Sequence, residues 1–350
     1  MTSPRALVVG ASGIVGYRIA ERLARNLGWS VIGLSRRPPA DRSVAHVPLD
    51  LTDAVGCYAT LREIGPVDHV YYAARYEPTA AASALVEMNL RMLRNVVEAT
   101  EAVSPALRHI HLVHGTKYYG APFGRYRTPS RENDPRCATG IFYHAQQDYI
   151  VERQQRSRWT WSISRPQAVS DVIPNPASNL PWCVAVYAAI CRARGVPLTF
   201  PGSPGGYGAI YQCTDARHLA RAVTWMASEP HCANQAFNVT NGDYFRWENL
   251  WPVIADYFGV PAGPVEQVRL EHVMPAWHDL WKDVSGAKGL RSRDIESLVS
   301  WRYLDFALGA DWDRMSDVTK LRKFGFHDVV ETEAMFQECF DSYRKQRLIP

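Results

Sequence analysis

A glycine-rich turn near the start of the chain constrains the fold more than any other feature. Residues 6–9 are a short apolar run typical of a strand buried on both faces, and apolar residues recur at helical spacing over 14–27. The turn between them carries Gly10, Gly13 and Gly16. The first glycine permits a tight turn, the second lets a pyrophosphate approach the backbone, and the third lets helix and strand pack closely. The pattern therefore predicts a dinucleotide-binding strand–turn–helix unit.

Strand and helix patterns alternate through the first half of the chain. We predict strands at residues 6–9, 31–34, 44–49, 69–74, 109–113 and 159–164, and helices at 14–27, 60–64, 85–103 and 142–153. This alternation implies parallel βαβ units with right-handed crossovers. The predicted fold class is α/β, with a Rossmann-type doubly wound parallel sheet.

The pattern changes after about residue 170. Prolines and glycines interrupt the chain as far as residue 208, which is typical of loops that cover a substrate site. Helical spacing returns at 219–227, 247–258 and 331–346, and residues 237–239 favour one more strand. We therefore predict a dinucleotide-binding Rossmann domain over residues 1–170. The expected remainder, 171–350, is a smaller, mainly helical C-terminal substrate-binding lobe with some segments returning to the sheet.

The second predicted strand is followed by two arginines where NAD-binding folds carry a carboxylate for the ribose 2′-hydroxyl. A guanidinium suits a 2′-phosphate, so Arg36 and Arg37 indicate NADPH, although a solvated surface pair is the alternative. Asp50 and Leu51 are candidates for the adenine contact. The predicted NADPH/NADP+ site comprises Gly10, Ser12, Gly13, Ile14, Val15, Gly16, Ser35, Arg36, Arg37, Asp50, Leu51, Tyr72, Ala73, Ala74, His114, Gly115, Tyr143, Pro166 and Val169.

The catalytic residues depart from the usual pattern of short-chain dehydrogenases, Y-x-x-x-K on one helix. Tyr143 opens the predicted helix, but the residue four positions later is Gln147. The first lysine of the chain is Lys117, in the loop after the fifth strand, and the next is Lys282. Taken alone, the missing motif leaves open a sensor that binds NADP(H) without turnover.

The run from His114 to Phe123, HGTKYYGAPF, resembles the T-G-x-K-x-Y-x-G-P-F segment of the progesterone 5β-reductase/iridoid synthase-like family of extended short-chain dehydrogenases/reductases. Residues 141–148, IFYHAQQD, resemble that family's N-F-Y-Y-x-x-E-D helix start. The runs YAAIC at 187–191 and FNVTNGD at 237–243 are similar to further family segments. His114, Ala121, His144 and Gln147 depart from the pattern.

The resemblance implies NADPH-dependent 1,4-reduction of an α,β-unsaturated carbonyl compound. Hydride adds to the β-carbon, and Tyr143 and Lys117 stabilise the resulting enolate. Phe123 and Tyr303 match pocket residues of the family, and Arg75 stands where plant members have tryptophan. The resemblance also implies a homodimer. A 1,2-carbonyl reductase and an NADP(H)-sensing regulator remain alternatives, whereas an epimerase would normally keep Y-x-x-x-K.

Composition excludes several other classes of protein. The 350 residues are 47% apolar and 21% charged, with a net charge of +4, which favours neither nucleic acid nor a membrane surface as partner. The chain has no signal-peptide pattern and no apolar run of ~20 residues, so we expect a cytoplasmic protein that binds a small molecule. Its seven cysteines form no C-x-x-C pair, and we predict no metal site.

Overall fold

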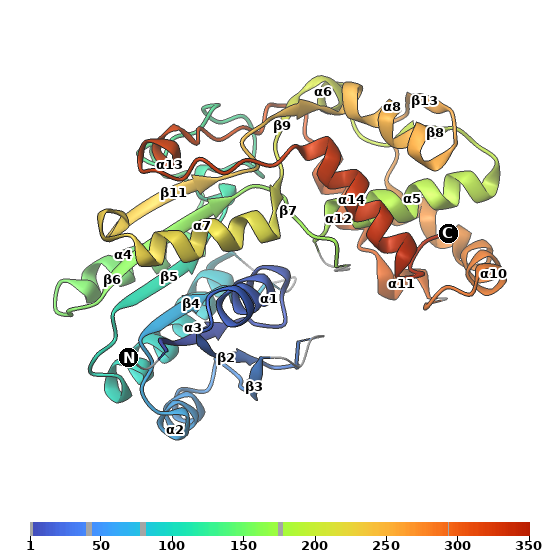
Figure 1. The fold of residues 1–350 in the computed structure, drawn as a ribbon. Coiled ribbons are helices and arrows are strands. Elements are labelled where there is room, and N and C mark those ends of the chain that lie inside the picture. Colours follow the sequence, from blue (N-terminus) through green and yellow to red (C-terminus); the bar gives the residue numbers. More distant parts are fainter. Residues whose placement is uncertain (1–2, 40–43, 78–81, 174–177, 293) are drawn as a thin grey trace.

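The computed structural model describes residues 3–39, 44–77, 82–173, 178–292 and 294–350, which form a sheet flanked by helices and a second, mainly helical lobe (Figure 1). Within these residues, seven strands build one parallel sheet in the order β11-β6-β5-β4-β1-β2-β3. The strands are β1 (Arg5–Val9), β2 (Ser30–Ser35), β3 (Ala45–Pro48), β4 (His69–Tyr72), β5 (His109–Val113), β6 (Thr160–Pro166) and β11 (Gln235–Val239).

Helices cover both faces of this sheet because its strands are apolar on both sides. In β1, Ala6 and Val8 pack under one layer of helices, whereas Leu7 and Val9 pack under the other. The predicted doubly wound parallel sheet is confirmed. The first layer contains α1 (Ile14–Glu21) and α7 (Ala216–Ser228), and the second contains α2 (Ala54–Ile64), α3 (Ala82–Val103) and α4 (Phe142–Gln154).

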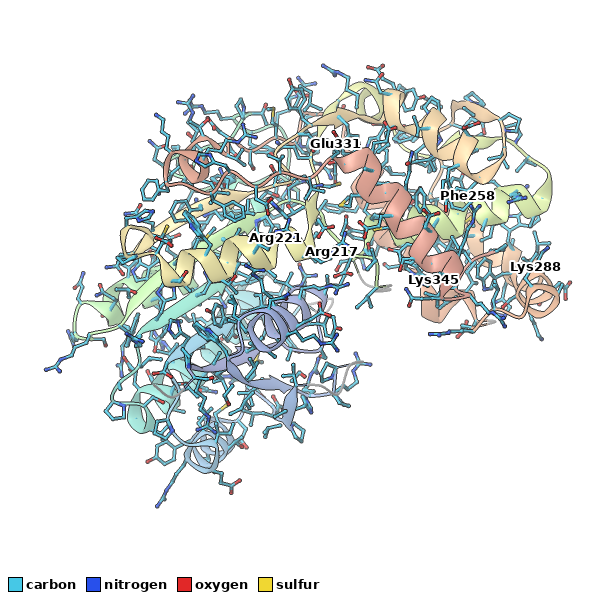
Figure 2. The ribbon with its side chains drawn as sticks, in the orientation of Figure 1. Arg217, Arg221, Phe258, Lys288, Glu331 and Lys345 are labelled. Atoms are coloured by element: carbon cyan, nitrogen blue, oxygen red, sulfur yellow. The ribbon has the colours of Figure 1, made fainter. Side chains whose placement is uncertain are left out.

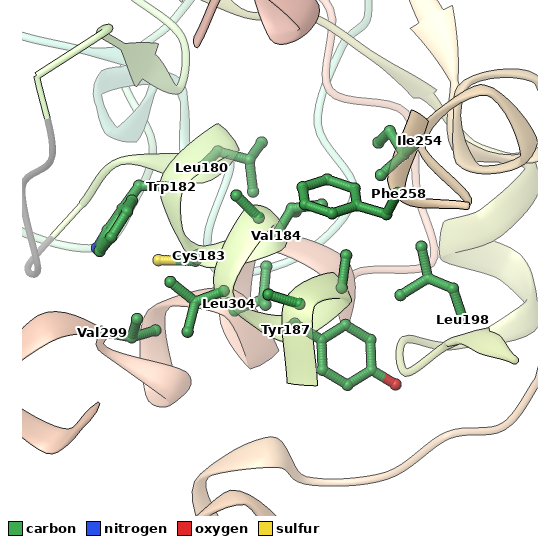
Figure 3. Packing of buried hydrophobic residues seen from close by; sticks show 14 of the residues in the cluster. Leu180, Trp182, Cys183, Val184, Tyr187, Leu198, Ile254, Phe258, Val299 and Leu304 are labelled. Atoms are coloured by element: carbon green, nitrogen blue, oxygen red, sulfur yellow. The ribbon is translucent and has the colours of Figure 1, made fainter. Parts of the chain in front are cut away.

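The second lobe has its own apolar core around α5 (Leu180–Arg194), whose first twelve residues are buried (Figure 3). Figure 3 shows Val184 of this helix beside Phe258, which comes from far along the chain. The helices packed around α5 are α8 (Trp247–Phe258), α10 (His278–Lys288), α12 (Trp301–Leu308) and α14 (Thr332–Lys345).

Short elements complete the described chain. Three two-stranded ladders pair β7 (Val169–Ser170) with β10 (Thr214–Asp215), β8 (Leu198–Phe200) with β13 (Ala262–Val265), and β9 (Ile210–Tyr211) with β12 (Phe245–Arg246). The remaining elements are η1 (Arg22–Asn26), η2 (Thr116–Tyr119), α6 (Pro204–Gly208), η3 (Pro230–Cys232), α9 (Leu270–Val273), η4 (Met274–Trp277), α11 (Ile295–Leu298) and α13 (Thr319–Lys323). None of the helices in the described ranges combines the length and apolar character that a bilayer crossing requires.

Several predicted boundaries were wrong, for identifiable reasons. The helix expected at 60–64 begins at Ala54, because the Asp53 side chain caps it by accepting a hydrogen bond from the Gly56 amide at 3.0 Å. The helix expected at 14–27 is α-helical only to Glu21 and continues as a π-helical turn. Helix α5 lies inside the region predicted as loops, of which residues 174–177 fall outside the described ranges. Segments from beyond residue 170, including α7 and β11, return to the sheet.

Two ion pairs connect the sheet to the second lobe. Arg18 on α1 makes a buried bidentate contact with Asp171, with Nε–Oδ2 2.7 Å and Nη2–Oδ1 2.6 Å. Arg217 on α7 bonds Glu338 on α14, with Nη2–Oε2 2.7 Å, and Figure 2 shows Arg217 at the end of α7 nearest the second lobe. Bidentate guanidinium–carboxylate pairs fix orientation as well as distance. The two pairs therefore fix the position of α1 and α7 relative to the second lobe.

A ladder of neutral histidines lies on the sheet face beneath α7. His109 bonds Thr160 and Ser162 at 2.8 Å each, and His111 bonds Ser162 at 2.7 Å and Ser164 at 3.0 Å. The buried His69 ring lies beside His109. Burial lowers the pKa of His69 to about 4 and the pKa of His111 to about 3. These rings therefore stay uncharged in the folded protein under conditions where they would titrate in the unfolded chain.

We expect the free energy of unfolding to decrease as the pH falls from 6.5 toward 4. In this range the histidines of the unfolded chain bind protons, whereas the buried histidines of the folded protein do not. Each such histidine costs about 1.4 kcal/mol per pH unit in this window. Urea unfolding between pH 7.5 and 5 measures the loss. His69→Phe should reduce the loss between pH 6 and 5 by about 1 kcal/mol, and the exposed His272→Phe should leave it unchanged. Equal losses in wild type and His69→Phe would contradict this account.

Candidate active site

A cleft of about 1150 Å³ opens at the carboxyl edge of the parallel sheet, where it meets the second lobe. Parallel strands all end at this edge, so the residues that follow them converge there. Of the predicted residues, the cleft is lined by Gly10, Ser12, Gly13, Ile14, Val15, Gly16, Ser35, Arg36, Arg37, Asp50, Leu51, Ala73, Ala74, Arg75, His114, Gly115, Lys117, Phe123, Tyr143, Pro166, Val169 and Tyr303. Tyr72 is not among the lining residues, because its side chain packs in the core below the sheet.

The three glycines of the first turn have different surroundings. Gly10 has a φ of +86°, and a Cβ there would lie 2.8 Å from the Ala74 amide nitrogen. A Cβ on Gly16 would lie 2.7 Å from the Gly10 carbonyl carbon. On Gly13 the nearest atom would be 3.4 Å away. The first and third glycines therefore seat α1 against the sheet, and the second leaves room on the cleft side, as a phosphate-binding turn requires.

The end of β2 is shaped by Ser35. Its hydroxyl donates to the Arg37 carbonyl oxygen at 2.7 Å and lies 3.0 Å from His46 Nε2, which tightens the turn that carries Arg36 and Arg37. Both arginines are exposed and line the cleft. Asp50 at the end of β3 accepts two hydrogen bonds from Thr52, which lower the pKa of the carboxyl. This end of the cleft can hold a phosphate beside a carboxylate.

Tyr143 is buried at the start of α4, and its ring stacks on His114 with centroids 4.6 Å apart. Burial raises the pKa of Tyr143, and the nearby Arg75 guanidinium opposes this effect in part. Burial also lowers the pKa of His114, and neither ring nitrogen of His114 has a hydrogen-bond partner among the described residues. The Tyr143 phenol therefore stays protonated, and its ring rests on a neutral imidazole.

Glu77 joins Arg75, which lies beside Tyr143, to Lys117, and sequence reasoning missed it. Its carboxylate pairs with Lys117 and lies 3.3 Å from Arg75 Nε. Arg75 in turn lies close enough to the Tyr143 hydroxyl to interact with it electrostatically. Burial alone would raise the pKa of the Glu77 carboxyl, but Arg75 and Lys117 lower it below its usual value. The carboxylate thus stays charged and holds both cations at the reacting end of the cleft.

The loop that carries Lys117 is anchored by residues that depart from the family pattern. His144 bonds the Tyr118 carbonyl oxygen through Nε2 at 3.0 Å. Gln147 accepts a hydrogen bond from the buried Arg165 at 3.0 Å, and Arg165 stacks on the Tyr118 ring. The two departures therefore serve to position the loop after β5 against α4 and β6.

The far end of the cleft is built largely by the second lobe. Phe123 and Phe306 are exposed aromatics on its rim. Tyr303 on α12, Tyr211 on β9 and Arg314 line the wall. No spacing rule predicted Tyr211 or Arg314, because the folding of distant segments brings them here.

Residues 53–350 match the PRISE-like Rossmann-fold domain model. The chain is 33% identical over 363 residues to an (S)-8-oxocitronellyl enol synthase of Nepeta racemosa, covering 99% of this chain and 93% of that protein. It is 32% identical over 362 residues to a 3-oxo-Δ4,5-steroid 5β-reductase of Arabidopsis thaliana, with the same coverage. The chain belongs to the PRISE-like family. The predicted resemblance is confirmed.

Solved structures agree on the fold. A UDP-glucose 4-epimerase of Thermotoga maritima is 15% identical, with a TM-score of 0.70 over 97% of this chain and 99% of that one. A short-chain dehydrogenase/reductase superfamily protein of Agrobacterium tumefaciens with bound NAD is 17% identical, with a TM-score of 0.69 over 98% of each chain. Together with the named reductase and enol synthase, these similarities identify this PRISE-like protein as a nicotinamide-dependent oxidoreductase. The homodimer and the cytoplasmic location stay predictions.

Two glycine substitutions should separate folding from nucleotide binding. Gly16→Ala places its methyl group against the Gly10 backbone and should lower the free energy of unfolding by about 1–3 kcal/mol. Gly13→Ala meets only ordinary contacts, so stability should stay near wild type while binding of the nicotinamide nucleotide weakens at least about tenfold, because the methyl group occupies the phosphate side of the turn. Urea unfolding and fluorescence titration measure the two effects. A Gly13→Ala protein that binds normally would rule out this role for the turn.

Proposed function

We propose that this PRISE-like protein is an NADPH-dependent ene-reductase that reduces the C=C bond of an α,β-unsaturated ketone or aldehyde. The observation that carries the proposal is the meeting of Tyr143 with Arg75 and Lys117, through Glu77, in the cleft that also contains the glycine turn. The named relatives, a reductase of steroid enones and an enol synthase, support the same chemistry.

The chain's residues fit NADPH. The glycine turn leaves room for a pyrophosphate, and the N-terminus of α1 offers backbone amides to it. Arg36 and Arg37 would hold the 2′-phosphate. When bound, the cofactor supplies the hydride that adds to the substrate's β-carbon.

The side chains of the cleft then stabilise the charge that develops on the substrate. The protonated Tyr143 hydroxyl donates a hydrogen bond to the carbonyl oxygen, which becomes an enolate oxygen as the β-carbon is reduced. Arg75 and Lys117 add positive charge beside that oxygen, and Glu77 keeps both cations in place. The stacked His114 ring supports Tyr143 without charging it. Solvent protonates the α-carbon and completes the saturated carbonyl product.

Removing these donors should slow reduction strongly. We expect Tyr143→Phe to lower kcat by about 10²–10³-fold, the usual effect of deleting an oxyanion donor, and Lys117→Met by a smaller factor. NADPH oxidation with 2-cyclohexen-1-one, citral and progesterone measures this. Tyr244→Phe, which changes an exposed tyrosine away from the cleft, is the matched control.

Product analysis by mass and NMR distinguishes the reaction types. A saturated carbonyl product that disappears in Tyr143→Phe supports the ene-reductase. Allylic alcohols, or turnover only of saturated ketones and aldehydes, would replace it with a 1,2-carbonyl reductase. If the protein binds NADPH but reduces no compound in a broad panel of carbonyl substrates, the result would favour the NADP(H)-sensing regulator.

Cofactor preference should depend on the arginines after β2. In the double variant Arg36→Ala/Arg37→Ala, we expect kcat/KM for NADPH to fall about 10–100-fold, because the 2′-phosphate loses its charge-assisted hydrogen bonds, and kcat/KM for NADH to change little. Arg62→Ala, at an exposed arginine on α2, controls for net charge. A wild-type enzyme that uses both nucleotides equally would overturn the assignment of NADPH.

A further inference from the structure

The substrate end of the cleft has an excess of positive charge that the reaction does not require. When the nucleotide end with the glycine turn, Arg36, Arg37 and Asp50 is left aside, the described residues that line the rest of the cleft include four cations and one carboxylate, Glu77. Glu77 already pairs with Lys117 and Arg75 at the reacting end. The two remaining cations are Arg302 and Arg314, both contributed by the second lobe.

Arg314 is the unusual member of this group. It is only 4% exposed, and no carboxylate of the described residues lies within ion-pairing distance. Its guanidinium donates to the Phe306 carbonyl oxygen at 3.1 Å and to the Ala307 carbonyl oxygen at 3.3 Å, and it reaches the Tyr211 hydroxyl at 3.5 Å. Its Nε has no hydrogen-bond partner among the described residues.

These contacts do not balance the charge. The carbonyl end of α12 offsets part of a positive charge, as helix C-termini do, but it supplies no full counter-ion. A buried charge without a partner is costly and is normally paired. Since Arg314 lines the cleft, a bound molecule can provide the missing anion.

The cleft places Arg314 away from the reacting end. Tyr303 lies within electrostatic range of both Arg75 and Tyr211, and Tyr211 contacts Arg314. The wall therefore runs from Tyr143 and Arg75, through the two tyrosines, to Arg314. A molecule whose carbonyl oxygen lies at Tyr143 would extend along this wall toward a guanidinium.

We propose that the substrate is an α,β-unsaturated aldehyde or ketone that carries a carboxylate at its far end, and that Arg314 binds this carboxylate. This inference rests on the proposed ene-reductase function and specifies its substrate class. A guanidinium recognises a carboxylate with two parallel N–H donors, and a site built for a charged group discriminates strongly against the analogue that lacks it. Arg314 is then a specificity-determining residue for the same reaction.

The test compares ω-carboxy enals of increasing length, from 6-oxohex-4-enoate to 10-oxodec-8-enoate, each with its methyl ester, with NADPH as the reductant. We expect kcat/KM for the acid to exceed that for the ester at least about tenfold at the best chain length. Arg314→Met should remove most of this preference by lowering kcat/KM for the acid and leaving the ester within about threefold. Arg314→Lys, which keeps the charge, should restore part of it. Arg192→Met, at an exposed arginine on α5, should change neither.

The outcomes separate the two proposals. Reduction of esters with no preference for any acid in the wild-type enzyme would overturn the carboxylate site and leave the ene-reductase intact. Failure to reduce any acid or ester would count against the ene-reductase itself. If Arg314→Met does not fold, the ratio of kcat/KM for the acid to kcat/KM for the ester, compared between the wild-type enzyme and Arg314→Lys, still decides the question.

Discussion

The close contact between Gly10 and Gly16 is the constraint on which the rest of this protein depends. The two backbones approach so closely that a methyl group on Gly16 would collide with the Gly10 carbonyl group. This contact lets α1 lie against β1 with its N-terminus directed into the cleft. Gly10 also touches the backbone of Ala73 and Ala74, which lead directly to Arg75. The packing of α1 against the sheet thus fixes the position of the glycine turn at one end of the cleft and of the segment that leads to Arg75 at the other.

The electrostatics of the reacting end follow from burial. Two cations placed beside a buried phenol would repel each other, and Glu77 compensates for them. Burial keeps Tyr143 protonated and His114 neutral, so the phenol can donate a hydrogen bond while its ring stacks on an uncharged imidazole. In the proposed reaction, these groups act as preorganised donors around the oxygen on which negative charge develops.

The sequence predicted the sheet and the glycine turn well, because alternating apolar runs and glycine spacing are local signals. It missed α5 because that helix is apolar on every side and so shows no amphipathic period, although Pro181 near its start and Gly195 after its end are typical helix signals. It also missed Glu77 and Arg314. Their roles depend on which distant residues they meet, and no spacing within one segment carries that information.

The motif positions were accessible from sequence because two segments that resemble family motifs contain them. Lys117 and Tyr143 lie in the cleft that the parallel topology creates, although they stand 26 positions apart in the chain. Tyr72 shows the limit of this reasoning. It ends β4 at the correct edge, but the alternation of the strand points its ring into the core.

The helices that cover the sheet determine which fragments of the chain could fold alone. The face that carries Ala6, Val8 and the histidine ladder is sheltered by α7, which begins at Ala216. A fragment that stops at residue 170 would contain every residue predicted to touch the nucleotide. It would nevertheless expose a broad apolar surface that only later segments can shield, and it would lack β11 at the edge of the sheet. The nucleotide half of this molecule therefore depends for its own solubility on residues that are made after it.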